Sequence, residues 1–138
     1  MGVNPGGTTA LNREVYVMVQ HIVFDGTGKI IRACLTGDVT SKELLELLDC
    51  LNDYRSAERC NKILIDVSGV LKTPGVAGLY EFAGSLSYDV YVALTVNSNN
   101  NADFMFLENT ALNRGRNLRL FRDEQDALSW LNASAKTI

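Results

Sequence analysis

The sequence predicts an α/β fold: a single domain with a mixed, mostly parallel sheet of about five strands and about four helices. Two observations lead to this prediction. Two strand-like segments near the N-terminus are separated by a short glycine-containing turn, which indicates an opening β-hairpin. After them, short apolar runs alternate with stretches in which apolar residues recur at helical spacing. Because strands that alternate with helices usually form a parallel sheet, only the hairpin should be antiparallel.

The opening hairpin is predicted over residues 15–35. From Val15 to Phe24, apolar and β-branched residues follow a period of two, which is typical of a strand. The segment Asp25-Gly26-Thr27-Gly28 supplies positions that tolerate positive φ, so the chain can reverse there. Ile30–Leu35 is then the returning strand.

The first helix is predicted over about residues 41–55. Thr40 and Glu43 form a capping box, in which each side chain accepts a hydrogen bond from a backbone N–H that lacks a partner at the helix start. Val39 and Leu44 lie at the positions of a hydrophobic staple. The apolar stripe of this helix consists of Leu44, Leu47, Leu48 and Leu51.

The central strand should be Lys62–Val67, a nearly continuous apolar run that suits a strand covered on both faces. Thr73 is expected to cap the next helix, with Pro74 at its first position, where the missing N–H would have no partner anyway. The residues expected to face the core are Val76, Leu79, Phe82, Ala83 and Leu86. The glycines of this helix weaken it by up to about 1 kcal/mol each relative to alanine: Gly75, Gly78 and Gly84.

The next buried strand is predicted at Asp89–Val96 and is followed by a run of polar residues. Asn101 is expected to cap a helix that ends before Gly115, a residue suited to the position just past a helix. The residues expected to face inward from this helix are Phe104, Leu107, Ala111 and Leu112.

The last strand is predicted at Leu118–Phe121, and Asp123 can cap a final helix. One face of that helix carries Ala127, Leu128 and Leu131. The domain is therefore expected to span residues 15–133, with a flexible polar tail at 1–14 and a C-terminal tail at 134–138.

Size and charge limit the classes of function. A chain of 138 residues corresponds to one domain, and 46% hydrophobic with 21% charged residues is typical of a globular protein. The net charge of −3 argues against general nucleic-acid binding, which requires a basic surface. No apolar run approaches the roughly 20 residues that cross a bilayer, and the N-terminus has no apolar signal core. The cysteines are odd in number and lack CxxC spacing, so we expect free thiols in a reducing cytoplasm: Cys34, Cys50 and Cys60.

Catalytic and cofactor motifs are missing from the sequence. His21 is the sole histidine and has no evident orienting partner for nucleophilic catalysis, so we expect it to be structural. One histidine and scattered cysteines do not provide a zinc site. Neither glycine-rich phosphate-binding motif is present. We therefore expect no catalytic residue, no metal and no cofactor, and a protein that is not an enzyme.

Three stretches of the sequence resemble the SpoIIAA-like branch of the STAS superfamily, the anti-sigma-factor-antagonist-like proteins. They are LTGDVT at 35–40, ILIDVSGV at 63–70 and LFRDEQDALSWL at 120–131. The last is similar to the F-x-[DE]-x-x-x-A-L-x-W-L ending of bacterial SpoIIAA-like proteins. The resemblance covers about residues 15–131, and it implies the SpoIIAA/STAS-like fold and usually a non-catalytic, regulatory role.

The sequence departs from the family at its regulatory position. Signalling members carry a phosphorylatable serine in an Asp-Ser-Ser-Gly motif at the start of the helix that follows the central strand. The aligned residues here are Pro74-Gly75-Val76-Ala77, and the nearest hydroxyl is that of Thr73. The superfamily fold also occurs in lipid-transfer domains, so the resemblance allows an apolar ligand as well.

The expected ligand or partner surface is the carboxyl edge of the sheet, where open α/β sheets bind ligands. Helix N-termini near Thr73 and Asn101 could hold an anion there, although capping and loop solvation are the simpler explanation for these polar residues. Three adjacent large apolar residues, 104–106, cannot all enter one core stripe and could line a groove or a dimer contact. The candidate surface residues are Asp66, Ser68, Lys72, Thr73, Asn97, Asn101, Phe104 and Phe106.

Two hypotheses of function follow. The first is a non-enzymatic cytoplasmic module that binds a protein partner through the carboxyl edge around Lys72–Thr73. The alternative is a carrier or sensor of a small, lipid-like apolar ligand, housed between the helix after Thr73 and the helix bearing Phe104–Phe106. A homodimer is compatible with either, because symmetric dimers are the commonest soluble assembly. An arginine-rich stretch could meet an acidic partner or an anion, or form a solvated face: Arg114, Arg116, Arg119 and Arg122.

Overall fold

The structure is a computed structural model that describes residues 19–26 and 28–134, and for residues 19–21 the backbone alone. The strands are β1 (Val19–Asp25), β2 (Ile30–Asp38), β3 (Lys62–Lys72), β4 (Tyr91–Thr95) and β5 (Asn117–Phe121). The helices of the described chain are α2 (Ser41–Glu58), α3 (Gly75–Gly84), α4 (Asn101–Asn113) and α5 (Glu124–Ser134). Residues 15–18, which the sequence places in the first strand, and both predicted tails lie outside the described residues, except for Ser134, which ends α5.

The strands form one five-stranded sheet in the order β1-β2-β3-β4-β5. β1 is antiparallel to β2, and the other neighbours are parallel. This confirms the predicted mixed α/β sheet with an opening hairpin. In the hairpin turn, the described residue with positive φ is Lys29 (φ 55°).

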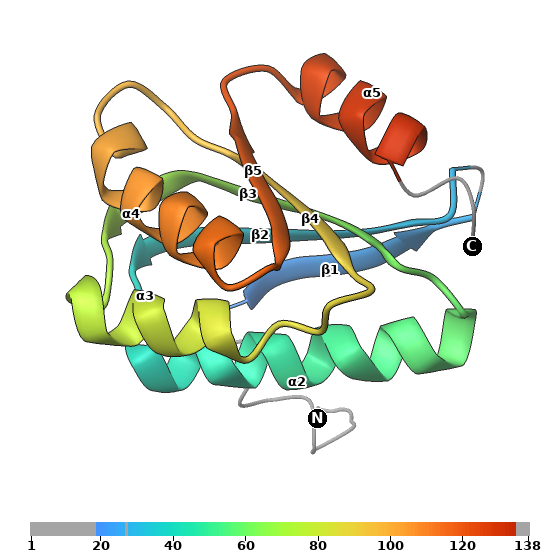
Figure 1. The fold of residues 1–138 in the computed structure, drawn as a ribbon, viewed down its shortest axis with the longest axis horizontal. Coiled ribbons are helices and arrows are strands. Elements are labelled where there is room, and N and C mark those ends of the chain that lie inside the picture. The colour runs from blue at the N-terminus through green and yellow to red at the C-terminus, as the bar shows by residue number, and fades with distance from the viewer. Residues whose placement is uncertain (1–18, 27, 135–138) are drawn as a thin grey trace, which may run out of the picture.

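The helices divide between the two faces of the sheet. Because β2 to β5 follow one another across the sheet and crossovers are nearly always right-handed, α2, α3 and α4 fall on one face. Their apolar residues join those of the strands in the main core, whereas α5 packs on the opposite face over β3, β4 and β5 (Figure 1). Residues alternate between the faces along each strand, so Ile63 and Ile65 enter the main core while Leu64 lies under α5.

β3 is longer than the sequence predicted. It was expected to end at Val67, but it continues to Lys72. Its pairing with β4 ends at Asp66, so the rest of the strand pairs with β2 alone. Polar residues and a glycine in this extension obscure the strand pattern. The β2–β3 register also shifts after Cys34, and such irregularities bend a strand away from a regular ladder.

Two predicted helix caps are confirmed. At α2, the Glu43 N–H donates to Thr40 Oγ1 at 3.2 Å and the Thr40 N–H donates to Glu43 Oε1 at 2.9 Å, which completes the capping box. At α5, Asp123 Oδ1 accepts a hydrogen bond of 2.8 Å from the Gln125 N–H. Gly115 has a φ of 77° just past α4, as its position predicted.

Two other predicted caps are wrong. Pro74 flanks α3 instead of occupying its first turn, and Thr73 Oγ1 accepts from the Gly75 N–H at 3.3 Å in the turn before the helix. At α4 the flanking residue is Asn100, not Asn101, and its side chain does not cap the helix. In both places the polar side chain serves the connection between strand and helix rather than the helix itself.

Two residues predicted to face the core are exposed. Val76 is 65% exposed and Leu112 is 52% exposed. Val76 lies in the first turn of α3, on the margin of the stripe formed by Leu79, Phe82 and Ala83. Leu112 follows buried Ala111 and therefore points about 100° away from it, toward solvent.

Candidate functional site

Asp66 lies where β3 parts from β4, on the face of the sheet that α5 covers further back. Its Oδ1 atom accepts three hydrogen bonds: from the Ser68 N–H at 3.0 Å, from Ser68 Oγ at 2.6 Å and from Thr95 Oγ1 at 3.0 Å. The carboxylate therefore ties the end of β4 to the first residues of the β3 extension.

These contacts set the protonation of Asp66. Burial alone raises the pKa of the carboxyl group, but the hydrogen bonds from the Ser68 side chain and backbone and from Thr95 lower it. The net effect is a pKa below the ordinary value of 3.8. Asp66 is thus a carboxylate at neutral pH, engaged in holding the local backbone.

The pH dependence of stability should report this arrangement. A lowered folded-state pKa contributes stability that is present above the unfolded-state value and lost as pH falls through the folded-state value. Asp66→Asn keeps an acceptor oxygen but removes the charge, so it should cost about 1 kcal/mol of unfolding free energy at pH 7. That difference from wild type should shrink below pH 3.8, where an aspartate of the unfolded chain is already mostly protonated. Urea unfolding followed by circular dichroism measures both quantities.

Asp53→Asn is the matched control, because Asp53 is an exposed carboxylate on α2. Its loss should change the free energy of unfolding at pH 7 by no more than about 0.5 kcal/mol. If Asp66→Asn and wild type instead lose stability in parallel from pH 7 into the acid range, the hydrogen bonds do not favour the charged form.

Two asparagine side chains take the place of a strand beside the β3 extension. Asn97 Nδ2 donates to the Ser68 carbonyl, and Asn100 Nδ2 donates to the carbonyls of Val67 at 2.9 Å and Val70 at 3.0 Å. The two asparagines also bond each other, since the Asn97 N–H donates to Asn100 Oδ1 at 3.0 Å and the Asn100 N–H donates to Asn97 Oδ1 at 2.9 Å. Asn100 is only 5% exposed, so this is a buried polar hub.

The structure brings together three of the predicted site residues: Asp66, Ser68 and Asn97. It adds Thr95, which the sequence pattern did not indicate, and Asn100, which lies in the polar run 97–101 expected at this edge but was not singled out. Five polar residues in a row at 97–101 indicate a loop, and nothing in that run distinguishes the one that is buried. The burial of Asn100 depends on the β3 extension, whose carbonyls need donors after β4 has ended, and the sequence pattern did not predict that extension.

The other predicted site residues lie apart from this cluster. Lys72 is exposed at the end of β3, and Thr73 is in the turn before α3. Asn101 is half-buried in the first turn of α4. Phe104 is buried in the main core, and Phe106 is partly buried against it.

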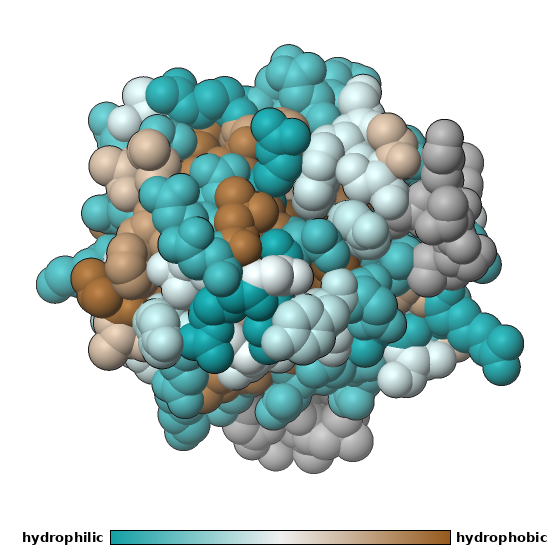
Figure 2. All heavy atoms as spheres, in the orientation of Figure 1, coloured by the Kyte–Doolittle hydropathy of each residue, from teal (hydrophilic) through white to brown (hydrophobic). Residues whose placement is uncertain are grey.

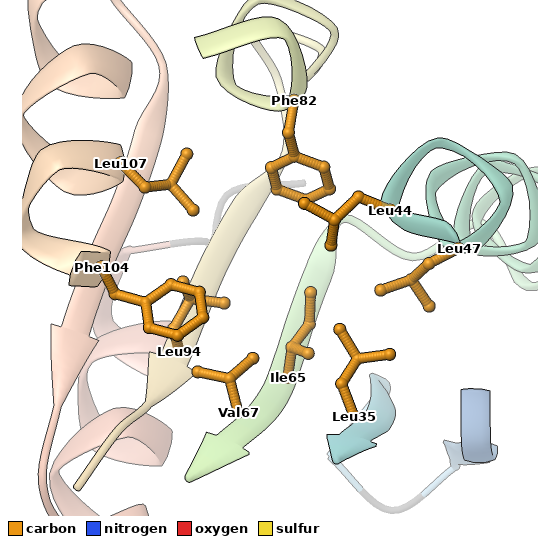
Figure 3. A pocket seen from close by; sticks show the side chains of 9 residues that line it. All are labelled: Leu35, Leu44, Leu47, Ile65, Val67, Phe82, Leu94, Phe104 and Leu107. Atoms are coloured by element: carbon orange, nitrogen blue, oxygen red, sulfur yellow. The ribbon is translucent and has the colours of Figure 1, made fainter. Parts of the chain in front are cut away.

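The space between α3 and α4 is filled by apolar side chains. In Figure 3, Phe82 from α3, Phe104 from α4 and Leu44 from α2 point toward one another above the sheet. The cavity that remains there has a volume of about 10 Å³, which is room for about one water molecule. Ligand pockets are larger by more than tenfold, typically about 300–1,000 Å³. The space between these helices therefore contains no cavity of ligand size, which counts against the apolar-ligand alternative; that alternative stays a prediction.

Titratable groups with metal-binding or redox chemistry are scattered. Within residues 19–26 and 28–134, no group of three His, Cys, Asp or Glu residues is placed to hold a metal ion. All three cysteines are free. Burial, with a smaller effect of Asp66, raises the pKa of the Cys34 thiol, so it is a poor nucleophile at neutral pH. The backbone of His21 pairs opposite Cys34, and the imidazole lies outside the described atoms.

The end of β3 and the outer side of α3 expose large apolar side chains. Leu71 is 82% exposed, Val76 is 65% exposed and Tyr80 is 54% exposed. Val76 and Tyr80 are four residues apart on α3, so they lie on the same side of the helix, and exposed Ala77 lies beside them. Figure 2 shows apolar atoms at the surface on the left of the molecule, where α3 begins in Figure 1. We call these four residues the α3 surface: Leu71, Val76, Ala77 and Tyr80.

Comparison with solved structures places the fold in a known class. The chain is similar to an uncharacterized protein of the DUF3478 family from Shewanella loihica PV-4, whose crystal structure has a SpoIIAA-like fold. The match has a TM-score of 0.56 at 14% sequence identity and covers 82% of this chain and 91% of that one. This protein therefore has a SpoIIAA-like fold, as the sequence motifs predicted. No family model matches the chain, and no curated protein matches it. Among the described helices, none combines the length and the apolar character needed to cross a membrane.

Proposed function

We propose that the protein is a non-enzymatic protein-interaction module of the cytoplasm, whose partner binds the α3 surface. The observation that carries this proposal is the composition of α3. A helix on a protein surface normally has charged or polar residues on its outer side, but α3 has one charged residue, Glu81, in its whole length. Exposed apolar groups of this kind mark interaction sites on soluble proteins.

The polar cluster at the carboxyl edge supports the same function. Asn97 and Asn100 follow β4 and donate to carbonyls of the β3 extension, which carries Leu71. Asp66 accepts from Ser68 in that extension and from Thr95 in β4, so the cluster holds the extension to β4 and its following loop. A partner surface that is fixed before binding loses less conformational entropy on association. The resemblance to SpoIIAA-like proteins, which usually act as regulators, is consistent with this role.

The proposal is tested by site-specific photo-crosslinking in the cells that make the protein. A photoreactive benzoylphenylalanine replaces Val76, and the matched control carries the same residue at Ser129, which is exposed on α5 on the opposite face. We expect one discrete protein adduct from position 76 that position 129 does not give. The adduct is identified by mass spectrometry, and the purified partner is then titrated against the variants.

Val76→Asp should weaken binding of that partner at least about tenfold, or 1.4 kcal/mol, because it places a charge in an apolar contact. Ser129→Asp should leave the dissociation constant unchanged. Equal adducts from both positions, no adduct at position 76, or an unaffected Val76→Asp variant would each refute the α3 surface as the contact.

A further inference from the structure

The arginine-rich stretch after α4 carries positive charge that no described carboxylate neutralises. The ion pairs of the described chain are those of Arg32 with Asp25 and Glu124, and of Arg55 with Asp89. None of them involves the arginines of this stretch, which are Arg114, Arg116, Arg119 and Arg122. On a chain with a net charge of −3, this is a local basic feature.

Arg116 is committed to the fold. Its guanidinium donates to the carbonyls of Leu86 at 2.9 Å, Gly84 at 2.9 Å and Arg114 at 2.8 Å, and its Cζ lies 4.0 Å from the centre of the Tyr88 ring. Gly84 is the last residue of α3, where carbonyls lack a helical partner, and Leu86 follows it by two residues. Arg116 therefore joins the end of α3 to the start of β5 and is not available to a partner.

Arg114 is half-buried and its guanidinium packs beside Gly84, but it is not committed to hydrogen bonds as Arg116 is. Its Cζ lies 4.8 Å from the centre of the Tyr80 ring, and its guanidinium has no hydrogen bond or ion pair to a described residue. Stacking on a ring holds a guanidinium in a defined place, while the N–H groups in its plane remain free to bind a carboxylate at two points. Glu81, the residue after Tyr80, is an exposed carboxylate, and it does not form an ion pair with Arg114.

The surroundings of Arg114 have the composition of an interface core. Tyr80, Tyr88 and Leu112 are each more than half exposed. Tyr80 lies in α3, Tyr88 in the connection from α3 to β4, and Leu112 near the end of α4, which packs against α3 (Figure 1). Tyrosine and arginine are enriched in the energetically dominant part of protein interfaces. Tyr80 also belongs to the α3 surface, so the two are continuous.

We propose that Arg114 anchors an acidic residue of the protein partner. A carboxylate of the partner pairs with the Arg114 guanidinium, while apolar side chains next to it in the partner contact Tyr80, Tyr88 and Leu112. A protein is favoured over a nucleic acid because the patch offers one free guanidinium, whereas binding to a phosphate backbone draws on many cations. This inference rests on the proposed function and names the chemistry of its partner.

The test selects short random peptides displayed on phage against the full chain. We expect the selected peptides to combine Asp or Glu with neighbouring apolar residues and to shift the backbone amide NMR signals of α3 and of the end of α4. Arg114→Gln should weaken the binding of these peptides at least about tenfold. Arg122→Gln is the matched control, because Arg122 is an exposed arginine of the same stretch that follows the far end of β5, and it should change nothing. Circular dichroism of both variants confirms that they are folded.

The alternative outcomes separate this inference from the proposed function. Peptides that lose affinity in Val76→Asp but bind Arg114→Gln normally would overturn the acidic anchor and leave the α3 surface in place. Selected peptides without acidic residues would do the same. If no peptide is enriched, or if the peptides shift amides elsewhere, both are overturned. A single-stranded oligonucleotide that binds in an Arg114-dependent way would replace the acidic protein with a nucleic acid.

Discussion

Asn100→Leu should lower the free energy of unfolding by about 3–5 kcal/mol, although it replaces a polar side chain with an apolar one of similar size. The carbonyls of Val67 and Val70 both depend on Asn100 Nδ2, and the Asn97 N–H depends on Asn100 Oδ1. Each buried polar group left without a partner costs about 1–3 kcal/mol. Urea unfolding followed by circular dichroism gives the change, with wild type measured under the same conditions.

Asn101→Ala is the control, because Asn101 is the residue that the sequence pattern favoured as the helix cap. The structure has Asn101 inside α4, so its loss should change stability by no more than about 0.5 kcal/mol. If Asn101→Ala destabilised the protein as much as Asn100→Leu, the assignment of Asn100 as the residue that supports the β3 extension would be contradicted. The same Asn100 variant should also weaken binding at the α3 surface, since the β3 extension that carries Leu71 loses its support.

The fold was predictable because its signals are local. The leucines of α2 repeat at helical spacing, and the capping box at Thr40 and Glu43 needs only three residues of separation. The alternation of strands and helices then determines the order of a parallel sheet. Each of these patterns depends on residues that are close together in the sequence, and each is present in the structure.

The site was predictable only in part, because its geometry depends on where strands end relative to one another. Asp66 follows an apolar run, and its place at a carboxyl edge could be expected. The burial of Asn100 could not be expected, because it results from β3 continuing to Lys72 after β4 has ended. The exposure of Val76 has the same origin: periodicity gives the side of a helix, but not whether another element covers its first turn.

The carboxyl edge of this sheet thus has a structural task where many α/β proteins place a ligand. Side-chain amides complete the hydrogen bonding of a strand that extends past its neighbour, and a carboxylate joins that strand to β4. These contacts support the connection that leads into α3, whose outer side is apolar. Under the proposed function, such support lowers the conformational entropy lost when a partner binds.

Phe82→Ala should lower the free energy of unfolding by about 3–5 kcal/mol. Phe82 is 2% exposed and packs between α3, α2 and α4, where the remaining cavity of about 10 Å³ lies. Collapse around the missing ring is limited, because Arg116 binds the carbonyls at the end of α3 and holds that end in place. The cost should therefore fall in the upper part of this range, and Phe82→Leu should cost less because it refills most of the space.

The enlarged cavity gives a second, independent readout of the packed core. It is lined by apolar side chains alone, so it should stay dry and bind a small apolar molecule such as benzene. Because a ligand that binds only the folded state stabilises it, benzene should raise the melting temperature of Phe82→Ala. Wild type should show no such rise, since its cavity admits no more than about one water molecule. An equal rise in wild type would mean that the core opens in solution, and it would contradict a function that depends on surface contacts alone.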